Sequence, residues 1–209
     1  MKKLIFAILS IAILLPTASM DAKSKLEKAR EKALKERTKE LKKGGWEPVG
    51  TKTLELCLEE HFAKLNDLGE DGHEVVGISN KSKSKNVGVQ TALNNAVITY
   101  AQEAGSTLKG RVISDINSNG VDPAGEFENF YAAYERLVEK EIKGELRPSF
   151  TILKTNKDGT VEVRTFFIVE EGQARLARQR ALENAMKESE LAAKHADQLS
   201  DFVRRGFEE

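Results

Sequence analysis

The sequence predicts an α+β fold, with a small antiparallel or mixed sheet, long helices packed on one face of it, and a charged N-terminal helix. Two long stretches, residues 89–116 and 172–205, repeat apolar residues every three or four positions, as amphipathic helices do. Residues 146–169 contain two apolar runs around the sequence Asn156–Gly159, which is typical of a β-hairpin. Hydrophobic residues make up 40% and charged residues 32% of the chain, so a packed core can form beneath a solvated surface.

The N-terminus has the features of a secretory signal. Two lysines follow the initial methionine, an uncharged apolar run extends from Leu4 to Leu15, and Pro16 is followed by small residues. The apolar run is too short to span a bilayer, which needs about 20 residues. We therefore expect residues 1–19 to be a signal peptide, and the mature protein to be exported, periplasmic or secreted, with no transmembrane segment.

A charged segment comes next. Residues 23–43 contain ten basic and four acidic residues, whereas the chain from Gly44 onward contains 21 basic and 28 acidic residues. The segment is rich in strong helix formers and ends at two glycines, which predicts a helical arm over residues 20–45. Two interpretations are open. The arm is a basic segment that binds an anionic surface or a partner helix, or it is a solvated helix that lies on its own acidic domain.

We expect residues 46–209 to form a single α+β domain, with its core within about residues 46–170. Residues 46–49 should be extended because of Pro48. The further elements expected in chain order are a helix over residues 54–65, a buried strand over 73–80, a polar loop over 81–86, the long helix 89–116, an amphipathic helix from about 126, the hairpin, and a C-terminal helix over 172–205.

Patterns of catalysis and of nucleic-acid binding are absent from the sequence. It has no nucleophile elbow, phosphate loop or dinucleotide fingerprint, and its three histidines, His61, His73 and His195, are scattered. The 33 basic residues balance the 33 acidic ones, and no strand interleaves basic with aromatic residues. We predict a protein that is not an enzyme, with no catalytic residue and no nucleic-acid partner. Its one cysteine, Cys57, excludes an internal disulfide and should be a buried thiol on a helix.

One stretch, residues 115–126, matches the twelve-residue calcium loop between two predicted helices. Calcium requires hard oxygen ligands, and the candidates are the side chains of Asp115, Asn117, Asn119 and Glu126 with the backbone carbonyl of Val121. Asp122 replaces the usual apolar residue, Pro123 follows it, and the chain has no second loop. Because a plain helix–helix turn uses the same residue types, a calcium site and a simple turn both remain open.

The middle of the chain resembles a known family. A strand at Glu74–Ser79 precedes the alanine-rich helix of Thr91–Ala101, and the hairpin ends with the apolar strand Val161–Val169. These patterns resemble the LPP20-like family of bacterial envelope lipoproteins, most nearly secreted Bacteroidetes-type proteins whose charged first helix ends near a Gly-Gly-Trp sequence. The resemblance covers roughly residues 24–190. It implies an α+β domain in the cell envelope without an agreed enzymatic role.

The chain differs from those lipoproteins because no cysteine lies near the end of its signal, so we expect no lipid attachment there. Together, these observations predict an exported cell-envelope protein that acts as an interaction or structural module. Its partner would be another envelope protein or a second copy of itself. The alternative is a calcium-stabilised exported binding domain that uses the loop at 115–126, and no other cofactor is expected.

Overall fold

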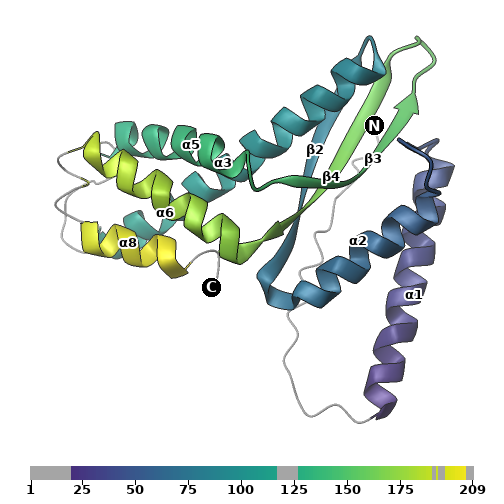
Figure 1. Ribbon diagram of the computed structural model, residues 1–209, viewed down its shortest axis with the longest axis horizontal. Coiled ribbons are helices and arrows are strands. Elements are labelled where there is room, and N and C mark those ends of the chain that lie inside the picture. The colour runs from purple at the N-terminus through teal and green to yellow at the C-terminus, as the bar shows by residue number, and fades with distance from the viewer. Residues whose placement is uncertain (1–19, 117–126, 190–191, 193–195, 206–209) are drawn as a thin grey trace.

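The computed structural model describes residues 20–116, 127–189, 192 and 196–205 (Figure 1). The predicted signal peptide lies outside these residues. The elements in chain order are α1 (Met20–Lys43), β1 (Glu47–Pro48), α2 (Leu54–Leu68), the short 3₁₀ helix η1 (Gly69–Asp71), β2 (Gly72–Ser82), α3 (Lys85–Ile116), α5 (Glu128–Ile142), β3 (Arg147–Thr155), β4 (Val161–Glu170), α6 (Glu171–Lys187) and α8 (Ala196–Arg205). The predicted α+β class is confirmed, and so is the charged N-terminal helix.

Two boundaries differ from the prediction. The polar loop expected over residues 81–86 is almost absent, because β2 runs to Ser82 and α3 begins at Lys85. The C-terminal helix expected over residues 172–205 is divided into α6 and α8. Ser189 explains the second difference, since its side-chain oxygen accepts a hydrogen bond from the backbone N–H of Ala192. This contact is typical of the start of a new helical segment and competes with continuation of the first helix.

The strands form one antiparallel sheet in the order β1-β3-β4-β2. The predicted hairpin joins β3 to β4, and Gly159 adopts a φ of 79° in its turn. The turn is stabilised by Asp158, whose carboxylate accepts hydrogen bonds from the backbone N–H and the hydroxyl of Thr160. These two bonds and that of the Lys81 ammonium lower the pKa of Asp158 to about 2. The hairpin thus places β4 at the centre of the sheet, between β3 and β2.

Helices cover both faces of this sheet. The prediction of helices on one face holds for the long helix α3, which lies on β2 and β4. The opposite face is covered by α2 and the end of α1. The reason is that Phe166 and Phe167 are consecutive residues of β4, so they point to opposite faces of the sheet, and both are buried. Phe167 belongs to the core beneath α3, and Phe166 packs with Phe150 and Leu58 in a second core beneath α2. A strand that is apolar on both sides needs cover on both faces.

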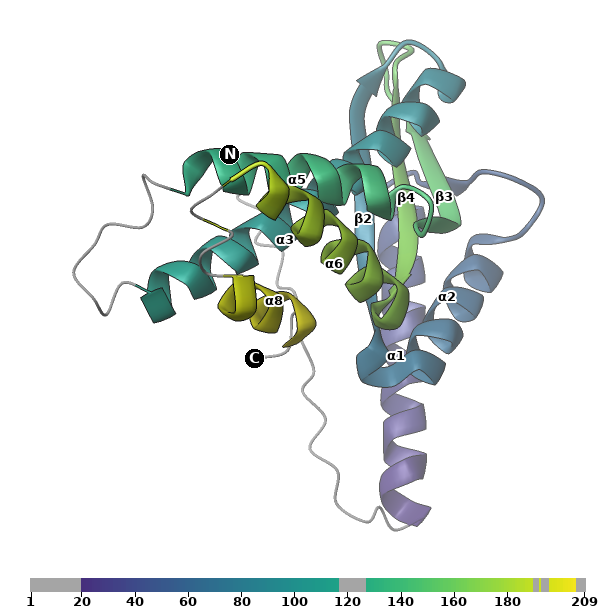
Figure 2. The same cartoon turned by 60° about the vertical axis from the view of Figure 1, so that its left-hand side comes forward.

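Helix α3 is longer than the sheet and links it to a helical layer. Its first half lies over the strands, and its second half extends past them to where α5, α6 and α8 gather (Figures 1 and 2). The apolar residues of this layer include Leu108 and Val112 of α3, Tyr134 and Val138 of α5, and Leu199 of α8. They form one continuous core with the sheet residues beneath α3, so the position of α3 determines the position of the other three helices.

Gly77 permits the closest contact between α3 and the sheet. A Cβ atom at this position of β2 would lie 1.8 Å from the backbone oxygen of Ala92 and 2.9 Å from the Cβ of Ala96. Only a residue without a side chain fits there, because atoms of the rigid α3 backbone occupy the space.

Substitution of Gly77→Ala should therefore lower the free energy of unfolding by about 3 kcal/mol or more, since the clash is with backbone and forces α3 off the sheet. Gly110→Ala is the matched control within α3, because a Cβ there meets no atom within 4 Å. It should raise stability by about 0.5–1 kcal/mol through helix propensity. Urea denaturation of both variants measures the difference. Equal stability of the two variants would contradict the close contact.

Candidate functional site

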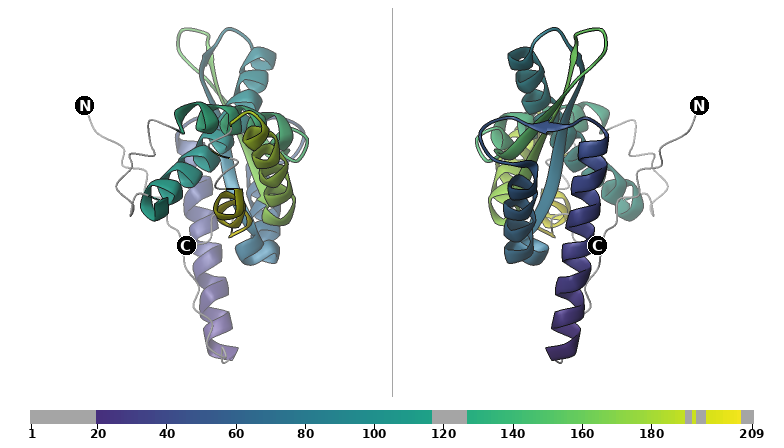
Figure 3. Two further views of the ribbon diagram at one scale, coloured as in Figure 1. Left: turned by 90° about the vertical axis from the view of Figure 1, so that its left-hand side faces the viewer. Right: turned by 90° about the vertical axis from the view of Figure 1, so that its right-hand side faces the viewer.

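Most of α1 projects away from the rest of the molecule (Figure 3). Between residues 27 and 43, only Leu34, Thr38 and Leu41 are turned toward the body, and every other side chain is exposed. The expectation that this helix lies on its own domain is therefore correct for the last turns alone. The side chains of residues 27–33 are exposed all around the helix, so this part of α1 is a surface open on all sides.

The C-terminal end of α1 is firmly anchored. Gly45 adopts a φ of 76° and ends the helix, and the backbone N–H of Trp46 donates to the carbonyl of Leu41 at 3.0 Å. The buried ring of Trp46 lies under the guanidinium group of Arg164, with 4.4 Å between the guanidinium carbon and the ring centroid. This cation–π contact and the packing of Leu41 against α2 attach the arm to the sheet.

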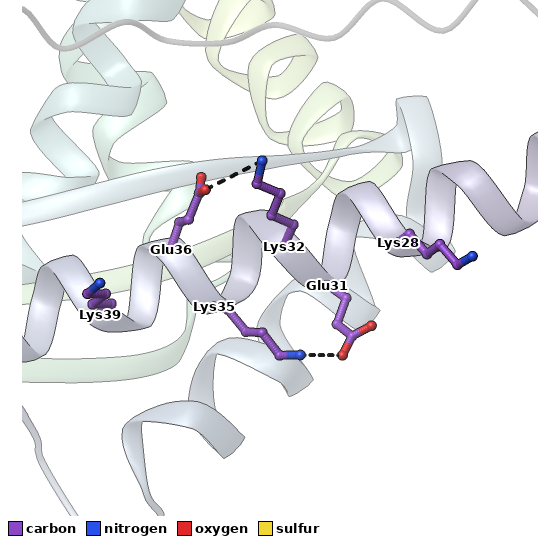
Figure 4. Close-up of a pocket in the computed structure, with 6 residues that line it drawn as sticks. All are labelled: Lys28, Glu31, Lys32, Lys35, Glu36 and Lys39. Atoms are coloured by element: carbon purple, nitrogen blue, oxygen red, sulfur yellow. Dashed lines mark hydrogen bonds and ion pairs between the residues drawn. The ribbon is translucent and has the colours of Figure 1, made fainter.

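Four lysines form a line along the exposed part of α1. Lys28, Lys32, Lys35 and Lys39 are separated by four, three and four residues, so they lie on one face of the helix. We call them the lysine stripe. At 3.6 residues per turn, the stripe is about 120° around the helix axis from the face that packs on the body. With Glu31 and Glu36 it borders a hollow on α1 (Figure 4).

The hollow is suited to a macromolecular surface rather than to a small molecule. All six residues that line it come from the same helix, so no opposing wall encloses it. Two ion pairs along the helix hold its side chains, one between Lys35 and Glu31 at 2.6 Å and one between Lys32 and Glu36 at 4.0 Å. The hydrogen bond from Lys35 lowers the pKa of Glu31, so both signs of charge are present on this face at neutral pH.

Helix α2, beside α1, carries the opposite charge. Residues 54–71 contain six acidic residues and one lysine. Four of the acidic residues, which we call the acidic face, lie on the exposed side of α2: Glu55, Glu59, Glu60 and Asp67. Leu56 is 42% exposed in the middle of this face. Glu55 pairs with Lys42 and Glu60 with Lys52, whereas no described cation pairs with Glu59 or Asp67.

A buried polar cluster lies between α3 and α6, and the sequence analysis did not find it. Arg178 donates hydrogen bonds to the carboxylate of Glu171 and to the hydroxyl of Tyr100. Burial opposes the charge of Arg178, but these bonds and charges outweigh it and raise the pKa of the guanidinium. Burial also raises the pKa of Tyr100 to about 12. Glu171 and Arg178 are seven residues apart on the alanine-lined face of α6, which was the available signal.

The histidines that the structure describes are also engaged in the core. His61 is buried on α2, where its Nε2 lies 2.7 Å from Glu74 Oε2 and its ring meets the edges or faces of Phe62, Phe150 and Phe166. His73 stacks on Tyr100, with ring centroids 6.0 Å apart. Cys57 is a buried free thiol on α2, as predicted, and burial raises its pKa. These groups form internal contacts and are not gathered around one site.

The predicted calcium ligands fall at the edge of the described structure. Asp115 is in the last turn of α3, and Asn117, Asn119, Val121 and Glu126 lie outside the described residues. Among the described residues, no three side chains of His, Cys, Asp or Glu come close enough together to hold a metal ion. Nor does any described helix have the length and apolar character that crossing a membrane requires.

Comparison with known proteins finds no match among family models, curated proteins or solved structures. The resemblance to envelope lipoproteins thus remains a prediction.

His73 makes the stability of the fold depend on pH. Burial lowers its pKa below 6.5, nearby Arg178 lowers it further, and Glu171 raises it; Tyr100 covers its ring. The folded state therefore binds the proton less tightly than the unfolded state does. The contribution of His73 to the free energy of unfolding is fully present above about pH 6.5 and is lost as the pH falls toward the folded-state pKa. The total loss is about 1.4 kcal/mol for each unit by which folding lowers the pKa of His73.

His73→Phe keeps the stacked ring and removes the titration. The free energy of unfolding of the variant should fall less than that of the wild type between about pH 7.5 and about pH 5. Guanidinium chloride denaturation at a series of pH values measures both slopes. Identical slopes for the two proteins would show that His73 titrates normally.

Proposed function

We propose that the protein is an exported, non-enzymatic interaction module of the cell envelope, and that the projecting part of α1 is its contact surface. The observation that carries this proposal is the exposure of every side chain from residue 27 to residue 33 on a helix that is anchored at its other end. A helix that packed only for stability would turn an apolar face along its whole length toward the body.

The interior polar groups favour a structural role over a catalytic one. Arg178 and Glu171 neutralise each other's charge, and His61 is paired with Glu74 among aromatic rings. Burial holds the pKa of Tyr100 and of Cys57 above the ordinary values, so neither is activated as a nucleophile or base at neutral pH. Export is supported by the sequence of residues 1–19, and a place in the cell envelope by the family resemblance.

Site-specific cross-linking in cells that produce the protein tests this function. A photoreactive residue at Glu36, among the lysines of α1, should give a cross-linked product of defined mass in the periplasmic or envelope fraction. The same group at Lys157, exposed in the β3–β4 turn, serves as the matched control and should give none. No product from Glu36, or equal products from both positions, would show that α1 is not the contact surface.

A second function, a calcium-stabilised domain, is supported by one observation. Helix α3 ends at Ile116 and α5 begins at Glu128, so the calcium pattern of residues 115–126 falls between two helices, as the motif requires. The two helices pack against each other through apolar residues such as Val112 and Phe130. A bound ion would therefore join elements of the main core.

Calorimetric titration of residues 20–209 with calcium should then show one site, lost in Asp115→Ala and retained in the control Asp71→Ala. At a calcium concentration about 100-fold above Kd, the free energy of unfolding should rise by about 2.7 kcal/mol. The melting temperature should fall in chelator accordingly. The absence of binding heat with an unchanged melt would make the stretch a plain turn.

A further inference from the structure

The two charged surfaces of this molecule complement each other, and on the basis of the function proposed above we infer that the partner of α1 is a second copy of this chain. The lysine stripe of one copy would lie on the acidic face of α2 of the other. Residues 27–43 carry eight basic and four acidic residues, while residues 54–71 carry one basic and six acidic residues. The lysine stripe spans residues 28–39 and the acidic face residues 55–67, and opposite charge along two stretches of similar length favours their alignment.

The two surfaces cannot meet within one chain. Helix α1 packs beside α2 through Leu34 and Leu41, so the lysine stripe points away from α2. Among the described residues, the ion pair between Lys42 and Glu55 is the one charged contact that joins these two helices. Lys28 and Lys39 of the stripe have no described ion-pair partner, and neither do Glu59 and Asp67 of the acidic face.

A second copy can satisfy both surfaces at once. In each copy the last turns of α1 lie beside α2, and the two helices run in opposite directions (Figures 1 and 3). A twofold axis between two such helix pairs places the lysine stripe of each copy against the acidic face of the other, in two equivalent contacts. Such an interface is closed, so it forms a dimer and not a filament.

The size of the interface predicts a weak dimer that is sensitive to salt. Helix α2 is 15 residues and therefore about 22 Å long, and two helices side by side are about 20 Å wide. The overlap is about 450 Å² in each copy, or about 900 Å² in total, which is below the usual range for stable interfaces and within that of weak, transient ones. Because the paired charges are exposed, salt screens them effectively.

Features of both surfaces favour a protein partner over an anionic membrane. Glu31 and Glu36 lie beside the lysine stripe and would repel a uniformly anionic surface. Lys64 likewise adds a positive charge to the otherwise acidic helix α2, so both surfaces have the mixed charge that a protein partner can match. No large apolar side chain is exposed on the described part of α1, so it has nothing to insert into a bilayer. Leu56 can be covered by the apolar stems of the lysines.

A charge exchange tests the dimer. The variant Lys28→Glu/Lys39→Glu puts two carboxylates into the lysine stripe, and Glu59→Lys/Asp67→Lys puts two lysines into the acidic face. Each variant therefore places like charges on both surfaces. Each variant alone should dissociate at least about tenfold more readily than the wild type in analytical ultracentrifugation at about 50 mM salt. An equimolar mixture should restore the dimer, because every contact again joins opposite charges. Lys143→Glu/Lys157→Glu, the matched control, changes the charge equally on exposed residues away from α1 and should dimerise like the wild type.

Circular dichroism verifies that α1 remains helical, and recovery in the mixture shows that both variants are folded. A wild type that stays monomeric, variants that still dimerise, or a mixture that does not associate would each overturn the inference. Binding to phosphatidylglycerol vesicles, with none to phosphatidylcholine vesicles and no dimer, would assign the stripe to a membrane surface instead. In that case, or if cross-linking at Glu36 captures a different protein and the wild type is monomeric, the dimer is excluded while α1 remains the contact surface.

Discussion

The close approach of α3 to β2 at Gly77 is the contact on which the rest of the structure depends. It brings the α3 backbone so near to the sheet that no Cβ atom fits between them, and it leaves the second half of α3 extending beyond the strands. Helices α5, α6 and α8 make their core on that extension. The helical layer is therefore positioned through α3, and the hydrogen bond from Arg178 of α6 to the hydroxyl of Tyr100 of α3 joins these two helices directly.

The two faces of the sheet are stabilised in different ways. Beneath α3 the core is large, and its buried charges are neutralised within it by Arg178 and Glu171. Beneath α2 the core is smaller and aromatic, with Phe150 and Phe166 stacked at 4.4 Å between centroids. A buried ion pair costs desolvation energy that its attraction barely repays, so it contributes specificity of packing more than stability. The smaller core holds α2 and the end of α1 on the sheet. These two helices carry the acidic face and the lysine stripe.

Much of this architecture is predictable from local patterns. The periodicity of α3, the hairpin turn at Asn156–Gly159 and the glycines after α1 each specify an element through short-range physics. The packing of helices on both faces of the sheet is not predicted, because it requires Phe166 and Phe167 to point to opposite faces of β4 and both to be buried. The end of α6 at Lys187 is followed by one side-chain contact, in which the backbone N–H of Ala192 donates to the Ser189 hydroxyl oxygen, and no periodicity predicts it. The cluster around Arg178 depends on residues 78 positions apart in sequence, which no local pattern reveals.

The orientation of α1 relative to the body also depends on contacts that local patterns do not reveal. The composition of this segment predicts a helix but not its orientation. Only three side chains decide that direction, and they leave the first turns without support from the core. The residues of α1 before Leu34 would form only a marginal helix in water by themselves, because isolated helices shorter than about 12–15 residues are weakly populated. Each ion pair along the helix contributes only about 0.2–0.5 kcal/mol. The exposed turns of α1 therefore gain little by being helical alone. Under the proposed function, a partner surface that bound the lysine stripe would add to the stability of those turns.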